Sequence, residues 1–508
     1  MATSATESSS GPRPTILSWL QAEPEDDCFL DLAELRQHFG AWRDASDSGD
    51  EVGMLELFDA RMLDIAGRFK PQLLTASLPV PRSLQVAAET LSECLLELAR
   101  RCNAMALRAG TGAEAVVQAV QLRARALRLL AEAYLIACMR GSDAVQGLWG
   151  LANAVLERLE RDLAEADDDR LLHVAAPGVL NFKRLAAISA LQPESLTARE
   201  QAWVFDYLEL TAGASELSAR PIHPEATAFW FELADDAAPT ACVRRLAPAH
   251  RPVRYFSAFG ISKRITEQIE WLERRISEAE VVGLERDVDL LDPDVSGLPL
   301  GLTPVEVLAL LNRLRERWVT PPSREHTRRP HLYSVQVCLG LKNIWAVNRG
   351  QPVPDAIVEW MVCNESPGGY GILSVAANKA VLSAGMVLAL RRDAKESWSI
   401  CVVRWVRNHD EDQIELGLQL VGASCVPVSI AFRGSELRVT TPALMLPPQP
   451  GTRGNSAILA PAGTYTSRRF VLVREGGQLY IAQGRVLSLD MQTASVELFQ
   501  YEVDPFPI

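Results

Sequence analysis

Two short segments of the chain combine residue types that suit an anionic ligand with planar rings. The first, REHTR (residues 324–328), places Arg324 and Arg328 four residues apart. An arginine guanidinium pairs with phosphate oxygens or with the O6/N7 edge of guanine, and its flat face stacks on a base. Two such groups in a linker can both reach one bound molecule, so this segment is a candidate for nucleotide binding.

The second segment, NESPGG (residues 364–369), is a polar turn between two apolar runs. Asn364 and Ser366 offer short hydrogen-bonding groups to the edge of a guanine, and the glycines let a flat base approach the backbone. Asn, Ser and Gly are also ordinary turn residues, so the turn alone is a weak signal. It gains weight because it follows an arginine-rich linker and joins two expected strands.

The elements that must hold these residues are strands. Beyond Pro330, short runs rich in Val, Ile, Leu and Trp alternate with clusters of Asn, Gly and Asp, without long helices between them. Examples are YSVQVCLGL, AIVEWMV, GMVLALRR, SWSICVVRWV and IELGLQLV. Strands this short and frequent are typical of a small barrel or sandwich, which would give the NESPGG turn a rigid support.

In this order and setting, the two motifs resemble those of the PilZ domain, the bacterial receptor module for cyclic di-GMP. The resemblance runs from Arg324 to about Cys425 and includes three later strands. These are Gly385-Met386-Val387-Leu388, Val403-Arg404-Trp405-Val406 and Leu416-Gly417-Leu418-Gln419. The resemblance implies a six-stranded antiparallel β-barrel that binds cyclic di-GMP through five residues, namely Arg324, Arg328, Asn364, Ser366 and Gly369.

Four neighbouring residues are further candidates for ligand contacts. Arg329 makes the register of the arginine pair ambiguous, although only the two arginines of REHTR have a spacing of four. His326 and Tyr370 carry rings that can stack on a base, although a histidine in a linker, such as His326, is more often solvated. Gly368 adds conformational freedom to the turn. The interval before the turn is longer than is usual for the family, and its extra segment, LKNIWAVNRGQPVP, could crowd the site.

The chain before this barrel is mainly helical. Ala113–Cys138 is rich in Ala, Leu and Arg without internal Gly or Pro, which favours one long helix. Residues 261–279 carry a single apolar stripe, made of Ile265, Ile269, Leu272 and Ile276. Two segments, AFWFELADD and PVRYFSAFG, are instead expected to form short strands.

A connecting helix precedes the barrel, and a second β-rich unit follows it. Thr303 can cap the helix, Pro304 suits its first turn, and Glu306 completes a capping box. In the last unit, EGGQ (residues 475–478) predicts a hairpin turn. The fold class is multidomain α+β, with a disordered tail (1–14), a helical region (15–290), a connecting helix and linker (291–323), the PilZ-like barrel (324–425) and the second β-rich unit (426–508).

The net charge of −13 arises in the helical part of the chain. From Pro321 to Ile508, 18 Lys and Arg residues stand against 16 Asp and Glu residues. An acidic surface repels nucleic acid backbones and acidic membranes, so DNA or RNA binding is not expected.

The longest strongly apolar stretch, near Leu129–Met139, is too short to span a bilayer, and the first residues lack a signal-peptide pattern. These features predict a cytoplasmic protein without membrane insertion.

The sequence lacks patterns for catalysis or metal binding. Its nine cysteines are scattered without CxxC spacing, which predicts small buried hydrophobes. Its seven histidines form no HExxH motif or Cys/His cluster, and there is no P-loop, GxGxxG or GxSxG. Trp360, Trp398 and Trp405 have strand spacing and are expected in the core rather than on a platform for the ligand. We therefore predict no enzyme activity, metal or other cofactor.

Two functions remain open from the sequence. The first is a non-catalytic cyclic di-GMP receptor, in which ligand binding repositions the acidic helical region toward a protein partner. The resemblance implies an output in motility, pili or biofilm. The second is a structural or interaction protein whose degenerate barrel binds no nucleotide. Thermal stabilisation by the ligand distinguishes the two, because only a receptor gains stability from binding.

Overall fold

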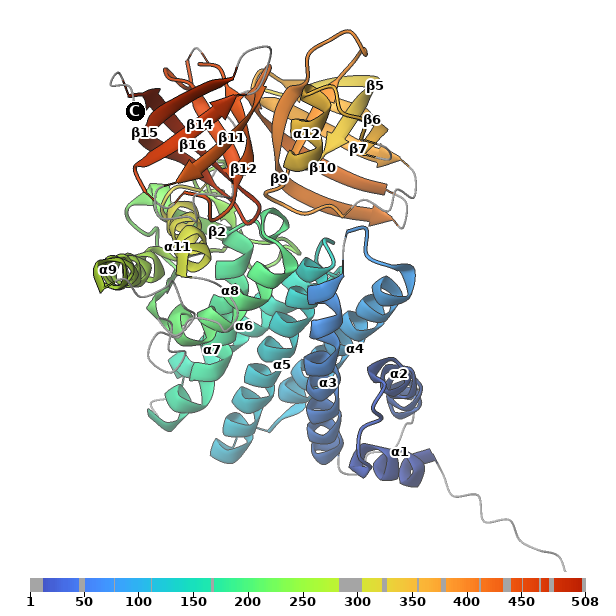
Figure 1. Cartoon of the computed structure of the whole chain (residues 1–508). Helices are drawn as coiled ribbons and strands as arrows, with labels where there is room; N and C mark the ends of the chain where they lie inside the picture. The colour runs from blue at the N-terminus through green and yellow to red at the C-terminus, as the bar shows by residue number, and fades with distance from the viewer. Residues whose placement is uncertain are drawn as a thin grey trace, which may run out of the picture.

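The helical and β-rich parts of the chain are separate in space, with two neighbouring barrels above a bundle of long helices (Figure 1). The structure is a computed structural model. It describes residues 12–44, 51–76, 78–110, 112–165, 169–282, 304–321, 327–353, 356–375, 381–410, 413–432, 440–449, 451–465, 467–474 and 479–504.

The helices pack around one continuous hydrophobic core, which extends from Ile16 to Trp318. Helix α5 runs through its middle and is buried on nearly all sides over its second half, as its apolar composition favours. It confirms the long helix predicted from Ala113. The described α-helices of this region are α1 (Pro12–Gln21), α2 (Cys28–Asp44), α3 (Glu51–Thr75), α4 (Arg82–Arg108), α5 (Ala113–Met139), α6 (Leu148–Glu165), α7 (Asp169–Ala190), α8 (Ala198–Thr211), α9 (Phe259–Val282) and α11 (Pro304–Val319).

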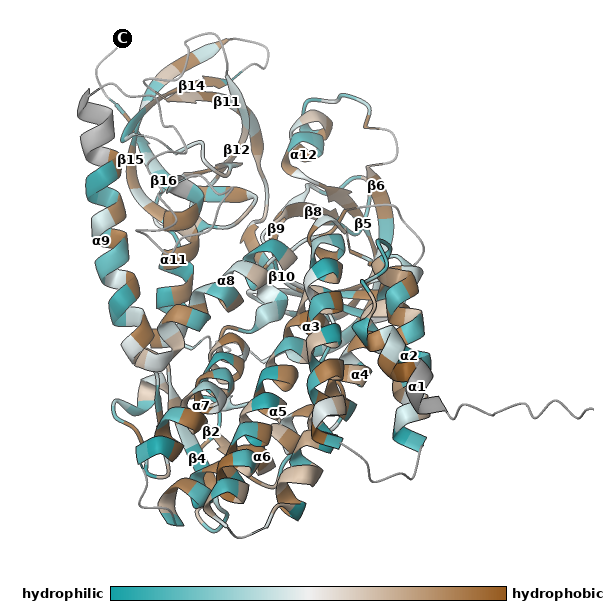
Figure 2. Cartoon of the chain, turned by 90° about the horizontal axis from the view of Figure 1, so that it is seen from below, coloured by the Kyte–Doolittle hydropathy of each residue, from teal (hydrophilic) through white to brown (hydrophobic). Residues whose placement is uncertain are grey.

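The two predicted helices at the end of this region are confirmed. In α9, the stripe residues Ile265, Ile269 and Leu272 are buried in the core, while hydrophilic positions cover other faces of the helix (Figure 2). Helix α11 begins at Pro304, as predicted. The predicted cap, Thr303, lies outside the described residues.

Helix α11 is anchored in the helical core close to the point where the chain leaves for the barrels. Trp318 is fully buried, and its indole Nε1 donates a hydrogen bond to the carbonyl of Ala187 at 3.0 Å. Arg317 donates to the carbonyl of Leu191 at 2.7 Å. The arginine segment that follows therefore starts from a fixed helix end.

The helical region also contains a small antiparallel sheet, in the order β1-β4-β2-β3. Its two central strands are the segments AFWFELADD and PVRYFSAFG, so the prediction of strands there is confirmed. The sheet consists of β1 (Glu216–Ser218), β2 (Ala228–Glu232), β3 (Thr240–Ala241) and β4 (Val253–Ser257).

The first barrel has six strands and closes in the order β10-β7-β6-β5-β8-β9, with every neighbouring pair antiparallel. The predicted six-stranded antiparallel barrel is confirmed. Alternate apolar residues of its strands fill the interior, as the period of two requires. The strands are β5 (Arg329–Leu339), β6 (Ile357–Ser366), β7 (Gly369–Val375), β8 (Val387–Arg391), β9 (Ser399–Asp410) and β10 (Gln413–Gly422).

The last part of the chain forms a second closed barrel, in the order β11-β12-β13-β16-β15-β14 (Figure 2). The predicted hairpin is present, since Arg474 pairs with Tyr480, although its turn at 475–478 lies outside the described residues. The strands are β11 (Val426–Phe432), β12 (Thr441–Leu446), β13 (Ala457–Pro461), β14 (Arg469–Arg474), β15 (Tyr480–Gln492) and β16 (Val496–Val503).

The two barrels share a layer of buried apolar side chains, to which Val387 and Ile400 contribute from the first and Leu444 and Leu459 from the second. The extra segment between β5 and β6 forms helix α12 (Leu341–Asn348), which joins this layer. Its contacts are with β5, β8, β11 and β12. The expectation that this insertion crowds the NESPGG turn therefore finds no support, since the helix packs against the second barrel instead.

The helical region meets the first barrel through a small set of backbone contacts. Leu382 donates its N–H to the carbonyl of Leu78 at 3.2 Å, and Asn408 donates its N–H to the carbonyl of Gly141 at 2.8 Å. Leu78 also packs against the cores of both parts. The junction therefore combines backbone hydrogen bonds between loops and strand ends with the packing of Leu78 against both cores.

Candidate ligand-binding site

A row of four paired residues crosses the first barrel beside the NESPGG turn. The strand register pairs Asn364 of β6 with Gly371 of β7, Gly371 with Gly417 of β10, and Gly417 with Trp405 of β9. Directly paired residues of antiparallel strands point to the same side of a sheet. Of the residues next to the two glycines along their strands, Ile372, Leu416 and Leu418 are buried in the barrel core and Tyr370 packs against it, so the row lies on the outer face.

The two central glycines leave room that the flanking side chains occupy. A Cβ atom on Gly371 would stand 2.5 Å from Nδ2 of Asn364, and one on Gly417 would stand 2.0 Å from Nε1 of Trp405. The carboxamide of Asn364 therefore lies across Gly371, and the indole of Trp405 lies across Gly417. We call this surface, formed by Asn364, Gly371, Gly417 and Trp405, the Asn–Trp shelf.

Arg328 reaches this shelf from the linker. Its guanidinium carbon lies 5.9 Å from the centroid of the Trp405 ring, within the range of cation–π attraction. Arg407, two residues along β9, lies 5.3 Å from the same ring. Two guanidinium groups thus flank one indole. Arg324 and His326, the other predicted ligands in the REHTR segment, lie outside the described residues.

Asn364 presents an unused hydrogen-bond acceptor at the shelf. Its Oδ1 is buried and accepts no hydrogen bond from the part of the chain that the structure describes. A buried acceptor without a donor costs about 1–3 kcal/mol, and such groups in native proteins call for a specific explanation. A bound molecule with an N–H group at this position would remove that cost.

The NESPGG turn closes the hairpin between β6 and β7 and is fixed to β10. Ser366 donates its hydroxyl to the carbonyl of Gly369 at 3.3 Å. The carbonyl of Gly368 accepts the N–H of Leu420 at 3.0 Å. A Cβ on Gly369 would stand 1.9 Å from the carbonyl oxygen of Leu418, so only glycine fits there. These residues shape the turn, and their contacts with a ligand stay a prediction.

Two other side chains of this hairpin face away from the shelf. Tyr370 packs against the barrel core. Glu365 accepts the Tyr333 hydroxyl at 2.6 Å and pairs with Arg392 at 3.1 Å, and the hydrogen bond from Tyr333 lowers the pKa of the Glu365 carboxyl. Because successive side chains alternate between faces, these residues lie opposite Asn364. Tyr370 is therefore not part of the shelf.

Further arginines, accompanied by Glu194 and Glu200, lie where α11 meets the first barrel. Burial, followed by the nearby charges of Arg404 and Arg313, lowers the pKa of Arg317 to about 10, so Arg317 stays protonated at neutral pH. Arg313 is paired with Glu200 of α8. The described part of α11 thus ends at Val319, close to both basic and acidic side chains.

Trp405 corrects one sequence-based expectation. Trp360 and Trp398 are buried, as predicted, whereas Trp405 is half-buried on the outer face of the barrel. The pairing of β9 with β10 shifts by one residue between Gly417 and Leu418, and this bulge turns Trp405 outward. A glycine inside a strand often marks the close approach of another group. Gly417 was therefore the sequence signal that could have predicted a side chain lying across β10 at this position.

Replacing Gly417 with valine should displace the Trp405 indole, because even the added Cβ would overlap it. We expect a large shift of the Trp405 indole N–H resonance in a ¹H–¹⁵N spectrum, with the resonances of Trp360 and Trp398 almost unmoved. Gly454→Val is the matched control, since a Cβ there meets nothing within 4 Å. An unmoved Trp405 resonance in Gly417→Val would contradict the shelf geometry.

The rest of the described chain adds little chemistry. All nine cysteines are unpaired, and seven of them are buried, as expected of small hydrophobes. No group of three or more His, Cys, Asp or Glu side chains among the described residues could hold a metal ion. None of the helices that the structure describes has the length and apolar character to cross a bilayer.

Two parts of the chain match the profiles of known domain families. Residues 14–224 match the family profile of the N-terminal domain of the cyclic-di-GMP receptor FimW, and residues 346–427 match that of its middle PilZ domain. The second match includes the NESPGG turn and begins after the REHTR segment. The first match covers residues 14–224 of the helical region, which the sequence alone left without a family.

Similarity to an individual protein is limited. The cyclic-di-GMP receptor FimW of Pseudomonas aeruginosa is 30% identical over 69 residues, which cover 14% of this chain and 11% of that receptor. No solved structure matches the chain significantly. Together, the closed barrel and the profile matches show a PilZ domain in the C-terminal half of the chain, preceded by a helical region that is similar to the N-terminal domain of FimW.

Proposed function

We propose that the chain is a cyclic di-GMP receptor whose site combines the REHTR segment with the Asn–Trp shelf and the NESPGG turn. The observation that carries this proposal is the convergence of Arg328, from a linker, and Asn364, from a strand end, on one outer face of a PilZ barrel. The matches to two domains of FimW support it, because that protein is a cyclic-di-GMP receptor.

The chemistry of cyclic di-GMP suits these groups. Its two phosphates and the O6/N7 edges of its two guanines are partners for the guanidinium groups of Arg328 and Arg324. A guanine can stack on the Trp405 indole, a contact worth about 1–3 kcal/mol per base. Guanine N–H groups can donate to Oδ1 of Asn364, with the Ser366 hydroxyl nearby.

Binding would reach the helical region through the REHTR segment. This segment connects the anchored end of α11 to β5, so closing it over a ligand would pull α11 and the first barrel toward a new arrangement. The ligand would then shift the position of the helical region relative to the barrel. We propose that this change presents or hides an acidic surface for a protein partner, with an output in motility, pili or biofilm.

The groups gathered at the shelf are hydrogen-bonding and stacking groups, so we propose binding without catalysis. We also propose that the receptor is cytoplasmic and acts without DNA, RNA or membrane insertion.

One observation favours the alternative, a supporting barrel that binds no nucleotide. The side chains of Asn364 and Trp405 already fill the space over the two glycines, as they would on a closed surface. Under this alternative the barrel stabilises the helical region, which would itself carry the function.

Calorimetric titration of the full chain with cyclic di-GMP decides between these functions. A receptor should give saturable heat and a raised melting temperature. A ligand at a hundred times its Kd adds about 2.7 kcal/mol to the free energy of unfolding. Cyclic di-AMP is the control, because adenine lacks the O6 acceptor that an arginine reads in guanine. No heat and no thermal shift with cyclic di-GMP would favour the supporting barrel.

A further inference from the structure

We infer that Arg407 is a third arginine of the ligand site and that Glu194 of the helical region competes with the ligand for it. The inference rests on the proposed function and adds to it a specific residue on each side of the junction. Neither residue lies in the motifs that the sequence singles out.

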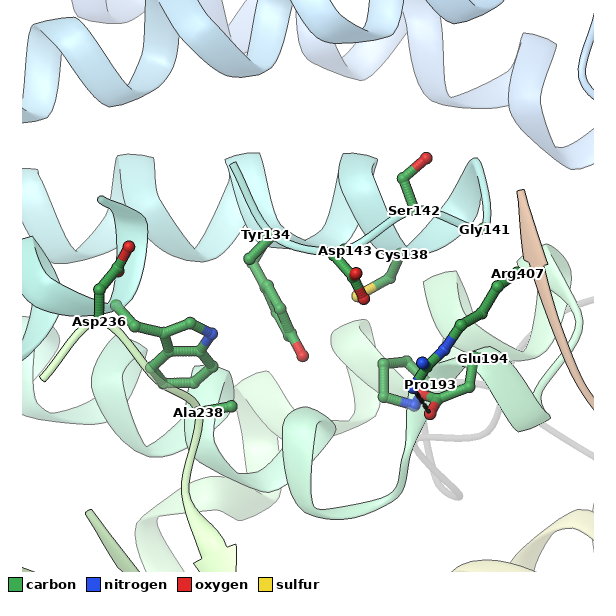
Figure 3. A pocket seen from close by; sticks show the side chains of 12 residues that line it. Tyr134, Cys138, Gly141, Ser142, Asp143, Pro193, Glu194, Asp236, Ala238 and Arg407 are labelled. Atoms are coloured by element: carbon green, nitrogen blue, oxygen red, sulfur yellow. Dashed lines mark hydrogen bonds and ion pairs between the residues drawn. The ribbon is translucent and has the colours of Figure 1, made fainter. Parts of the chain in front are cut away.

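Arg407 stands between two groups that belong to different parts of the molecule. Its guanidinium carbon lies 5.3 Å from the centroid of the Trp405 ring, and its Nη2 atom lies 3.1 Å from Oε1 of Glu194. Glu194 belongs to η1 (Pro193–Ser195), the short 3₁₀ helix between α7 and α8. Figure 3 shows Arg407 extending from a barrel strand to this carboxylate.

The ion pair is open to competition. The side chain of Arg407 is 43% exposed and that of Glu194 is 22% exposed. Ion pairs that water reaches contribute little, because solvent screens them and both side chains lose freedom. A guanidinium that meets a phosphate can form two parallel charge-assisted hydrogen bonds. A phosphate bound above Trp405 would therefore take Arg407 from Glu194.

A second carboxylate near Arg407 does not change this argument. Glu415 of β10 is paired with Arg407 in the strand register. Glu415 belongs to the same barrel and moves with Arg407. It therefore reduces the attraction of Arg407 for an anion equally before and after ligand binding. Glu194 differs because it sits on the helical region, and only its contact with Arg407 is made or broken across the junction.

Loss of the pair would also change a cavity at the junction. Its lining includes Trp149 of the helical region and, as Figure 3 shows, Tyr134 and Cys138 of the same region. Among the described residues that line it, Arg407 alone comes from the barrel. When Arg407 turns toward a ligand, the cavity loses that wall. Ligand binding at the shelf would therefore directly change the shape of this cavity on the surface of the helical region.

A double-mutant cycle on the full chain tests the inference, with calorimetric titration of cyclic di-GMP as the measurement. Arg407→Ala should raise Kd about tenfold or more, since one charge-assisted contact is lost. Glu194→Gln should lower Kd about two- to fivefold, because it removes the competitor of the ligand. In the Arg407→Ala background, Glu194→Gln should change nothing, since the two residues act on one another.

The matched control is the exposed pair Arg485–Glu502 on the second barrel. Arg485→Ala and Glu502→Gln should leave Kd within about twofold, because an exposed pair away from the site has little influence. The inference is overturned if wild type binds and Arg407→Ala binds equally well. It is also overturned if Glu194→Gln has the same effect with and without Arg407. If wild type itself gives no heat, the proposed function and this inference fail together.

Discussion

Replacing Arg328 with alanine is expected to weaken binding of cyclic di-GMP by about a hundredfold. The variant removes a guanidinium that lies 5.9 Å from the Trp405 ring, at the shelf where we place the ligand. Hydrogen bonds to charged groups contribute about 1.5–3 kcal/mol, and every 1.4 kcal/mol is about tenfold in Kd. Calorimetric titration of the full chain at one fixed salt concentration measures the change.

Arg329→Ala is the matched control, because it removes the same charge one residue further along. Arg329 is exposed at the start of β5, and its removal should change Kd by no more than about threefold, as expected for a screened surface charge. A large loss with Arg329→Ala and none with Arg328→Ala would put the arginine pair in the other register. No loss with either variant, in a wild type that binds, would place the ligand elsewhere.

Trp318→Ala is expected to lower the free energy of unfolding of the helical region by about 3–5 kcal/mol, the usual cost of removing a large aromatic from a core. Trp318 is completely buried, and its indole N–H satisfies the carbonyl of Ala187. The substitution leaves a cavity and an unpaired carbonyl together. Urea denaturation followed by helical circular dichroism measures the loss.

Trp271→Ala provides the comparison for Trp318→Ala. Trp271 lies on α9 and is only partly buried against the same core, so its loss should cost less than half as much. Equal losses in the two variants would mean that α11 is not anchored by Trp318. Because α11 leads into the REHTR segment, Trp318→Ala should also weaken cyclic di-GMP binding in a chain that remains folded.

Much of the candidate site could be predicted because its signals are local. The NESPGG turn lies where two apolar runs meet, and the structure has β6 and β7 joined there. Arg328 is the last residue before β5 and contacts the barrel on the face that Asn364 shares. These placements can be predicted from short stretches of sequence, because successive side chains of a strand alternate between its two faces.

Other residues of the site could not be predicted, because their positions depend on the partner strand. Trp405 has the spacing of a core residue, and only the bulge opposite Gly417 turns it outward. Gly371 and Gly417 gain a role from the side chains that neighbouring strands place over them. A bulge is a property of two strands together, so the sequence of either strand alone does not reveal it.

The amino-acid sequence by itself determined the kinds of elements, their order, the first barrel and the turn that borders the shelf, because periodicity and turn chemistry act between near neighbours. Tertiary structure alone decided the closure of the second barrel, the docking of α11 and the meeting of Arg407 with Glu194. That last pair is 213 residues apart in the chain. Contacts of such separation exist only after whole domains have packed, since their loop-closure entropy must be overcome by other interactions first.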